Sequence, residues 1–215
     1  IVAAKTDPTA GARGISLFLV DTSLPGFERG RNLSKIGQHC GDTSELFFED
    51  CRVPASALLG EEGKGFAYLM QELPRERLVI GVIACGAARG VLDLTIDYAK
   101  ERELFGQTLS QLQNTRFRIA EMESDAQVNA AFVEQCIQQY KRGELDAATA
   151  SMAKYSATEM QCRVADGCLQ LFGGYGYTTE YPVSRAFTDA RVQRIYGGTS
   201  EVMKEVIARS LLGRG

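Results

Sequence analysis

The 215-residue sequence is poor in the residues that hold metal ions: it has no Cys-x-x-Cys pair and only one histidine, His39. A structural zinc site needs four cysteine or histidine ligands, and a di-iron helical bundle needs two Glu-x-x-His pairs. The sequence therefore predicts no metal site of either kind. Its six cysteines fall mostly in helical or apolar context, and we interpret them as reduced thiols of a cytosol-like compartment. They are Cys40, Cys51, Cys85, Cys136, Cys162 and Cys168.

The sequence also lacks a strong excess of charge and a long uninterrupted apolar segment. A net charge of −3 gives no electrostatic reason for binding to nucleic acid or to an anionic membrane. No apolar run approaches the roughly 20 residues that cross a bilayer, so we expect no membrane span. The chain starts at Ile1 with neither a start methionine nor a signal-peptide pattern, and we expect it to be a fragment of a longer protein.

One long helix is the most clearly predicted element, over residues 63–100. Apolar residues recur there in steps of three and four, which places them on one helix face. The same spacing falls once on Glu76, so a carboxylate takes the place of an apolar side chain. Pro74 lacks an N–H and is expected to kink the helix nearby. The apolar row comprises Phe66, Leu69, Leu73, Ile80, Ile83, Ala87, Val91, Leu94 and Tyr98.

Glu76 permits two interpretations. A buried carboxylate can be neutralised by a neighbouring guanidinium, here that of Arg75 or Arg77, in a purely structural ion pair. Burial without such a partner instead raises the pKa of the carboxyl group, which suits a general base that faces a substrate cavity. The spacing alone does not separate these two interpretations.

The rest of the sequence predicts β-structure in the first sixty or so residues and helices after them. Strand candidates are 1–4, 15–20, 27–36 and 45–48 (the last continuing toward Val53), with a hairpin joining the first two. Further helices are expected at 112–142, 145–172 and 181–192, and from Ser200 onward. Asp146 or a neighbour is expected to open the helix at 145–172, while Ser200 is suited to an N-cap and Pro182 to a first turn. Four substantial helices with short connections predict an antiparallel bundle.

Two glycine-rich segments, Phe172–Tyr177 and Ile195–Glu201, interrupt the helical pattern. Neither follows a parallel strand, so a Rossmann dinucleotide site is not indicated. The second segment opens a helix, where free N–H groups and a hydroxyl can bind an anion. Both segments are equally compatible with ordinary helix boundaries that use glycine as a C-cap.

Five segments, taken together and in this order, resemble the acyl-CoA dehydrogenase family over nearly the whole chain. The resemblance implies the C-terminal part of such a protein: a partial middle β domain over 1–60 and a C-terminal helical bundle domain over 61–215. The expected fold is therefore mostly α, an antiparallel four-helix bundle preceded by the last strands of a β-barrel-like domain. The segments are Asp42–Phe48, Arg102–Gly106, Leu171–Tyr177, Arg185–Arg191 and Gly198–Glu201.

The family oxidises fatty acyl-CoA thioesters to trans-2-enoyl-CoA in fatty acid β-oxidation, with FAD as acceptor. A glutamate removes the α-proton while hydride leaves Cβ, and a ribityl hydroxyl of FAD and one backbone N–H hold the thioester oxygen. Many members carry this glutamate at the position of Gly197, which has no side chain to act as a base. The long-chain and isovaleryl branch carries it on the long helix instead, and Leu73–Leu78 resembles that branch. The resemblance therefore implies Glu76 as the catalytic base.

The remaining site residues are also implied by the resemblance. Arg102 matches a contact to the diphosphate of a neighbouring subunit's FAD, although a surface arginine at a helix end is the alternative. Arg77 matches a residue beside CoA, with a salt bridge to Glu72 or Glu76 as the alternative. We expect His39 and Tyr175 to be structural. The other implied cofactor contacts are Gln113, Gln170, Leu171, Phe172, Gly173, Gly174, Thr199, Ser200 and Glu201; the substrate side comprises Pro74, Arg75, Arg77, Gly197 and Gly198.

The resemblance further implies an acyl-CoA substrate, an electron-transfer flavoprotein as electron acceptor, and a homotetramer. It places the protein in the cytoplasm of a bacterium or in the mitochondrial matrix of a eukaryote. An acyl-CoA oxidase-type flavoenzyme and a non-catalytic helical assembly module remain open as alternatives, and the acyl chain length is not predicted. We expect residues 1–215 alone to bind FAD weakly or not at all.

Overall fold

The computed structural model describes residues 1–213, and the chain divides into two compact units, Ile1–Leu73 and a second unit from Pro74 onward. The long helix α1, Gly65–Glu101, belongs to the first unit as far as Leu73 and to the second from Pro74 onward. It continues through Pro74 as a single helix, and a kink at that residue stays a prediction.

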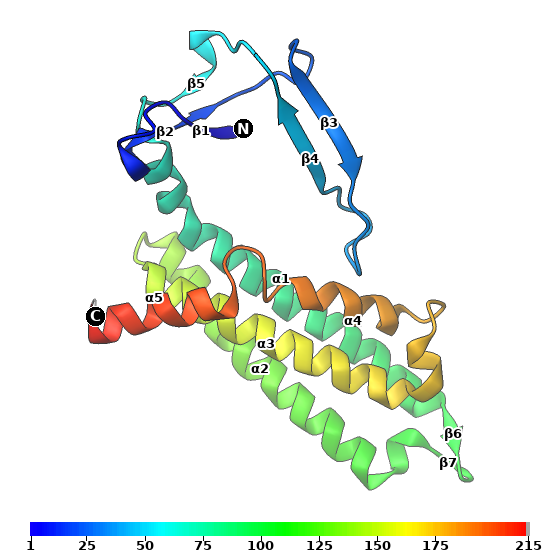
Figure 1. Ribbon diagram of the computed structural model, residues 1–215. Coiled ribbons are helices and arrows are strands. Elements are labelled where there is room, and N and C mark those ends of the chain that lie inside the picture. Colours follow the sequence, from blue (N-terminus) through cyan, green and yellow to red (C-terminus); the bar gives the residue numbers. More distant parts are fainter. Residues whose placement is uncertain (214–215) are drawn as a thin grey trace. The chain divides into compact units, whose positions relative to one another are not determined.

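The first unit is built from short antiparallel strands (Figure 1). Strands β1 (Val2–Lys5), β2 (Ile15–Phe18) and β5 (Leu58–Leu59) form one sheet in the order β1-β2-β5. The pairing of β1 with β2 confirms the predicted hairpin. A separate pair joins β3 (Phe27–Asn32) to β4 (Ser44–Phe48). Strand β4 ends at Phe48 and does not continue toward Val53 as the sequence predicts. The chain enters a bend at Glu49 and takes a positive φ of 48° at Asp50.

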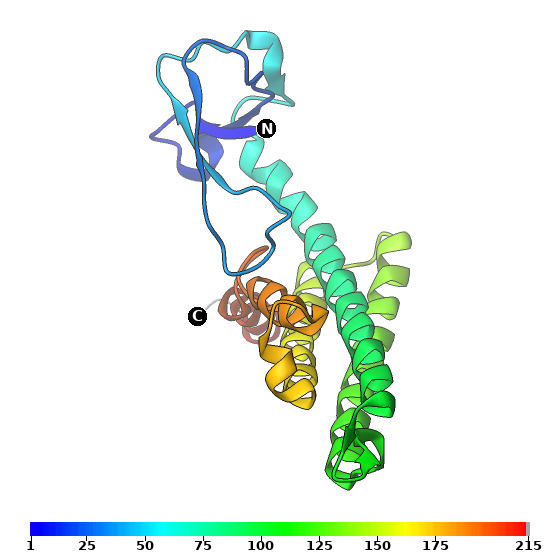
Figure 2. The same ribbon diagram turned by 90° about the vertical axis from the view of Figure 1, so that its right-hand side faces the viewer.

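The second unit is a helical bundle, as predicted, and the described residues contain five α-helices in all. After α1, a small hairpin of β6 (Glu103–Leu104) and β7 (Gln107–Thr108) leads to α2 (Gln113–Lys141). Helices α3 (Ala147–Phe172), α4 (Pro182–Val192) and α5 (Ser200–Leu212) follow. Helix α3 contacts α2, α4 and α5, and Figures 1 and 2 show α1 and α2 running beside it. Fourteen residues of α3 are buried, which makes it the centre of the unit.

The main apolar core joins α1, α2, α3 and α4. Its buried members include Leu92 of α1, Met122 of α2, Met160 of α3 and Val183 of α4. At one end of this core the ring of Phe172 stacks on that of Tyr98, with centroids 4.0 Å apart. The six cysteines are free thiols in the described residues, in agreement with the prediction.

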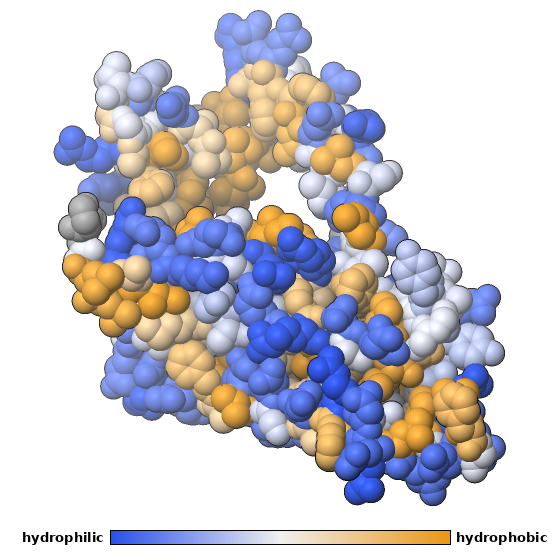
Figure 3. Space-filling view, turned by 60° about the horizontal axis from the view of Figure 1, so that its bottom comes forward, coloured by the Kyte–Doolittle hydropathy of each residue, from blue (hydrophilic) through white to orange (hydrophobic). Residues whose placement is uncertain are grey.

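The buried face of α1 matches only part of the apolar row that the sequence predicts, since Val91 of that row is buried in the main core. Ala84, Ala88 and Leu92 are fully buried, whereas Ile83 and Leu94 of the predicted row are 48% and 37% exposed. The helix is apolar almost all round, so its periodicity offers two candidate faces, and the smaller side chains pack against the bundle. Figure 3 shows other apolar side chains gathered in surface patches. The exposed large apolar residues of α1 are Phe66, Leu69, Met70, Val79, Val82, Ile83 and Leu94.

The apolar composition of α1 bears on the expectation that the chain has no membrane span. An 18-residue window of α1 has a mean hydropathy of 1.8, enough to cross a bilayer by length and composition. A core helix of a bundle passes the same test, and 33% of that window is buried inside the structure. One such helix is weak evidence for a membrane protein.

The start of α3 provides a test of local stability. The carboxylate of Asp146 accepts a hydrogen bond from the N–H of Thr149 at 2.8 Å, so Asp146 itself, and not a neighbour, is the N-cap. We expect Asp146→Ala to lower the free energy of unfolding by about 1 kcal/mol at pH 7, as measured by urea denaturation.

The pH dependence of that loss separates capping from other effects. The hydrogen bonds from Thr149 hold the pKa of the Asp146 carboxyl below its usual range. A depressed folded-state pKa stabilises the fold above the unfolded value of about 3.9 and less as the pH falls below it. The difference between Asp146→Ala and the parent protein should therefore shrink as the pH falls from about 4 to about 2. Asp166→Ala, on an exposed position of the same helix, is the control and should leave the free energy of unfolding at pH 7 nearly unchanged.

Candidate active site

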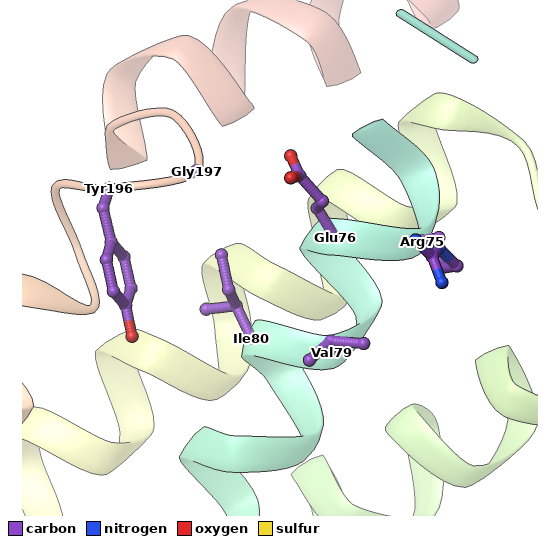
Figure 4. A pocket seen from close by; sticks show the side chains of 6 residues that line it. All are labelled: Arg75, Glu76, Val79, Ile80, Tyr196 and Gly197. Atoms are coloured by element: carbon purple, nitrogen blue, oxygen red, sulfur yellow. The ribbon is translucent and has the colours of Figure 1, made fainter. Parts of the chain in front are cut away.

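Glu76 and Gly197 line the same pocket, which has a volume of about 430 Å³ (Figure 4). Glu76 comes from α1 and Gly197 from the loop between α4 and α5. The carboxylate of Glu76 points into the space beside the Gly197 loop, while the Arg75 side chain projects from the other side of α1. The pocket is lined by Arg75, Glu76, Val79, Ile80, Tyr196 and Gly197.

The structural ion-pair interpretation of Glu76 is not what the structure shows. Within residues 1–213 the Glu76 carboxylate forms no salt bridge and no side-chain hydrogen bond. The nearby charge of Glu76 acts on Arg77 only by raising its pKa against the larger effect of burial, which lowers it. The Glu76 side chain is also exposed, contrary to its place in the apolar row, because that row is only partly buried: Val91 lies in the core, whereas Ile83 is 48% exposed.

Gly197 adopts a conformation that suits glycine and little else. Its φ is +64°, and a Cβ atom added there would lie 2.3 Å from Cδ1 of Ile80. The adjoining Gly198 has a φ of +100°, also in the left-handed region. Within residues 1–213 the N–H of Gly197 donates to no protein acceptor. The loop therefore presents an unused backbone donor on the wall of a pocket whose other wall carries Glu76.

Two buried side chains on α3, which the sequence reasoning missed, hold the surroundings of this pocket. Lys154 is fully buried, and its Nζ donates to the carbonyl oxygen of Gly198 at 2.7 Å. The Oγ of Ser151 accepts a hydrogen bond from Nη1 of Arg77 at 3.1 Å. The available signal was a lysine in an otherwise small and apolar stretch of a predicted core helix.

Arg77 lies where it cannot easily reach a ligand in the pocket. It is 6% exposed, packs toward α3 and does not line the pocket with Glu76. Its burial lowers the pKa of its guanidinium. Of the other residues expected on the substrate side, Arg75 and Gly197 line the pocket, whereas Pro74 and Gly198 flank those that do.

A second pocket, of about 510 Å³, gathers several of the expected cofactor residues. It contains the guanidinium of Arg102, which lies 5.3 Å from the centroid of the Tyr175 ring. That guanidinium forms no salt bridge within the described residues. Gly173 has a φ of +60° and open space where a Cβ would lie, so a ligand can approach the backbone closely. Leu171, Phe172, Gly173 and Gly174 line this pocket, but Gln113 and Gln170 do not.

The start of α5 forms a third, separate hollow of about 90 Å³ that includes Thr199, Ser200 and Glu201. Thr199, not Ser200, is the N-cap, since its hydroxyl accepts from the N–H of Val202 at 3.3 Å. Ser200 is the first helical residue, and its hydroxyl donates to Oε1 of Glu159 at 2.7 Å. Its side chain is 3% exposed and turned inward. The prediction erred by one position because two adjacent hydroxyl residues are both suited to cap a helix.

No cluster of metal-ligating side chains occurs between residues 1 and 213. His39 lies in the first unit, where its Nε2 hydrogen-bonds with the carbonyl oxygen of Lys35 at 2.9 Å. Tyr175 packs at 5.2 Å between ring centroids against Tyr181, so its ring belongs to the aromatic end of the core while also facing Arg102.

Comparison with known proteins identifies similar chains. A family model described as the C-terminal domain of acyl-CoA dehydrogenase matches residues 63–212. The long-chain specific acyl-CoA dehydrogenase of mitochondria from Sus scrofa is 53% identical over 99% of this chain and 50% of its own length. The chain thus spans about half the length of the curated relatives it matches.

Solved structures agree with this result. The crystal structure of acyl-CoA dehydrogenase from Geobacillus kaustophilus matches with a TM-score of 0.96 and 48% identity, over 99% of this chain and 56% of the other. A second match is a chain in a structure entitled "Electron transferring flavoprotein of Acidaminococcus fermentans: Towards a mechanism of flavin-based electron bifurcation". Its TM-score is 0.95 and its identity 38%, over 99% of this chain and 56% of the other.

Proposed function

Because this chain belongs to the acyl-CoA dehydrogenase family, we propose that the full-length protein oxidises fatty acyl-CoA thioesters to trans-2-enoyl-CoA in fatty acid β-oxidation. The observation that carries the proposal is the pocket in which the unpaired carboxylate of Glu76 lies across from the unused N–H of Gly197. We propose the domains to be 1–60 and 61–215.

Glu76 is the base in this proposal, and Gly197 supplies one hydrogen-bond donor. The α-proton of a thioester is weakly acidic, and its removal places negative charge on the thioester oxygen. Glu76 takes that proton, while the N–H of Gly197 stabilises the charge on the oxygen. FAD, when bound, would supply the two-electron acceptor for the hydride that leaves Cβ, while the α-proton ends on Glu76.

Exclusion of water strengthens the interactions of a base and of a hydrogen-bond donor with the reacting substrate, and the pocket of Glu76 is open on one side. We propose that the acyl chain and the part of the full-length protein beyond these 215 residues cover the open side of the pocket. The exposed apolar residues Val79 and Ile83 of α1, close to Glu76 in sequence, favour such a covering surface.

The residues around Arg102 fit the diphosphate of FAD. A planar guanidinium without a carboxylate partner offers a bidentate contact to phosphate, and the open backbone at Gly173 and Gly174 allows close approach. The start of α5 fits a second, smaller contact, since Glu201 and Thr199 line a hollow at a helix N-terminus. The hydroxyl of Ser200 already donates a hydrogen bond to Glu159, so we expect the FAD contacts at this helix start to come from Thr199 and Glu201.

The spacing of the two pockets favours an oligomer. The roughly 26 residues from Glu76 to Arg102 span about 39 Å at the rise of an α-helix. An FAD molecule bound beside Glu76 would have to span this distance to reach Arg102 of the same chain. We propose a homotetramer in which Arg102 reaches the FAD of a neighbouring subunit.

The electron acceptor and location are further parts of the proposal. The matched chain in the electron transferring flavoprotein structure favours such a flavoprotein as the partner that reoxidises FAD. The mitochondrial relative favours the mitochondrial matrix if the source is a eukaryote, and the cytoplasm if it is a bacterium.

The proposal predicts the outcome of anaerobic titration of the full-length protein. The purified protein should carry FAD, and its oxidised flavin absorbance should bleach when acyl-CoA is added. A series of acyl chain lengths then gives the preferred substrate. A protein without flavin would instead support the non-catalytic assembly module, and a flavin that is not bleached by any acyl-CoA would contradict the proposal.

The oxidase alternative is separated by the fate of the electrons. In air, an oxidase consumes O₂ and releases peroxide during turnover, whereas the proposed dehydrogenase needs an added electron acceptor.

A further inference from the structure

We infer that Lys154 and Ser151, one turn apart on α3, are positioning residues that fix the two walls of the Glu76 pocket relative to each other. One wall is α1, which carries Glu76, and the other is the loop that carries Gly197. This inference rests on the proposed function and concerns residues that do not line the pocket themselves.

Lys154 holds the loop wall. Its Nζ donates to the carbonyl oxygen of Gly198, the residue directly after Gly197. Two consecutive glycines in the left-handed region are intrinsically free to change conformation, because neither has a Cβ to restrict its dihedral angles. A donor that must meet a thioester oxygen needs a position fixed to within about 0.5 Å. The hydrogen bond from Lys154 supplies that restraint beside Gly197.

Ser151 holds the helix wall. Its Oγ accepts from Arg77, the residue directly after Glu76, and donates to the carbonyl oxygen of Ala147 at 2.6 Å. The hydroxyl is thus oriented as an acceptor toward α1. Through Arg77 it restrains the turn of α1 from which the Glu76 side chain projects.

The charges around Lys154 indicate that its side chain does more than fill space in the core. Burial and the positive charge of Arg77 lower the pKa of the Lys154 ammonium, while the carboxylates of Glu159 and Glu201 raise it. A buried ammonium costs more than an apolar side chain of the same volume, such as methionine. The carbonyl of Gly198 is the acceptor that this costly side chain reaches.

A neighbouring contact secures the far end of the same loop. Oε1 of Glu159, also on α3, accepts from Ser200 at 2.7 Å and from Nε of Arg194 at 2.8 Å. The loop is therefore attached to α3 on both sides of Thr199, and Lys154 is the attachment next to Gly197.

The test is Lys154→Met in the full-length flavoprotein, with Lys141→Met at the exposed end of α2 as the matched control. We expect Lys154→Met to retain FAD and to lower kcat about 10- to 100-fold, since a displacement of about 1 Å in a reacting group costs this much. The change in KM should be much smaller, because the residue does not touch the acyl-CoA. Lys141→Met should match the parent protein.

A spectroscopic readout separates positioning from a general loss of structure. Hydrogen bonding to a thioester carbonyl lowers its stretching frequency, which isotope-edited infrared difference spectra of bound ¹³C-labelled acyl-CoA report. We expect part of this lowering to be lost in Lys154→Met. Unchanged kcat and unchanged carbonyl frequency in that variant would overturn the inference.

Two further variants keep the test decisive. If Lys154→Met does not yield a folded flavoprotein, Ser151→Ala replaces it, with the same expected decrease in kcat and the same outcome that would overturn the inference. Glu76→Gln is measured in parallel. An active Glu76→Gln variant contradicts the proposed function, whereas an inactive one beside a fully active Lys154→Met variant contradicts only the role of Lys154.

Discussion

Glu76→Gln in the full-length protein is expected to lower the rate of flavin reduction by acyl-CoA about 10²- to 10⁴-fold, the usual contribution of a positioned general base. Glutamine has nearly the same shape as glutamate and can still line the pocket, but its amide cannot take the α-proton. The rate is measured as the loss of oxidised flavin absorbance after anaerobic rapid mixing with a saturating acyl-CoA.

The matched control is Glu72→Gln, which makes the same chemical change one helical turn earlier. Glu72 is exposed and does not line the pocket, so its variant should reduce flavin at the parent rate. Binding of acyl-CoA should survive in Glu76→Gln, because the carboxylate acts on the proton and not on the CoA moiety. Flavin reduction at the parent rate in Glu76→Gln would show that Glu76 is not the catalytic base.

Arg102→Ala is the second change with a large expected effect, and it acts on the cofactor. Hydrogen bonds to charged groups contribute about 1.5–3 kcal/mol, so losing the guanidinium should raise the Kd for FAD about 10- to 150-fold. The measurement is the fluorescence change when the flavin-free, full-length protein is titrated with FAD. Arg102→Lys keeps the charge but loses the bidentate geometry and should give an intermediate Kd.

A control arginine distinguishes phosphate binding from a general change in charge. Arg118 lies on α2, outside the pocket around Arg102, and pairs with Glu121 at 3.3 Å. Arg118→Ala should leave the Kd for FAD unchanged. If Arg102→Ala also leaves it unchanged, Arg102 is a surface arginine at a helix end and the phosphate assignment fails.

Local signals in the sequence were sufficient for most of the fold. Asp146, Pro182 and the glycines at 143 and 173 mark helix ends through capping and backbone preferences that depend on few neighbours. The inward face of α1 was not predictable in this way. Apolar residues surround that helix, and the choice between faces depends on how closely small residues such as Ala84 and Ala88 approach the other helices.

The candidate site was predictable where a residue broke a local pattern. Glu76 interrupts an apolar row. Gly197 stands at the position where, as the family resemblance implies, many members carry the catalytic base. Lys154 gave a weaker signal because its partner, Gly198, lies 44 residues further along the chain. Contacts of that kind form only when distant segments fold together, and no periodicity in the sequence reports them.

The most direct test of the proposed mechanism is the distance from the Glu76 carboxylate to the α-carbon of a bound, unreactive acyl-CoA analogue in a crystal structure of the full-length flavoprotein. The account predicts about 3–3.5 Å, the separation of reacting atoms in a near-attack geometry. A Glu76 carboxylate directed into solvent, with another side chain beside the α-carbon, would contradict it.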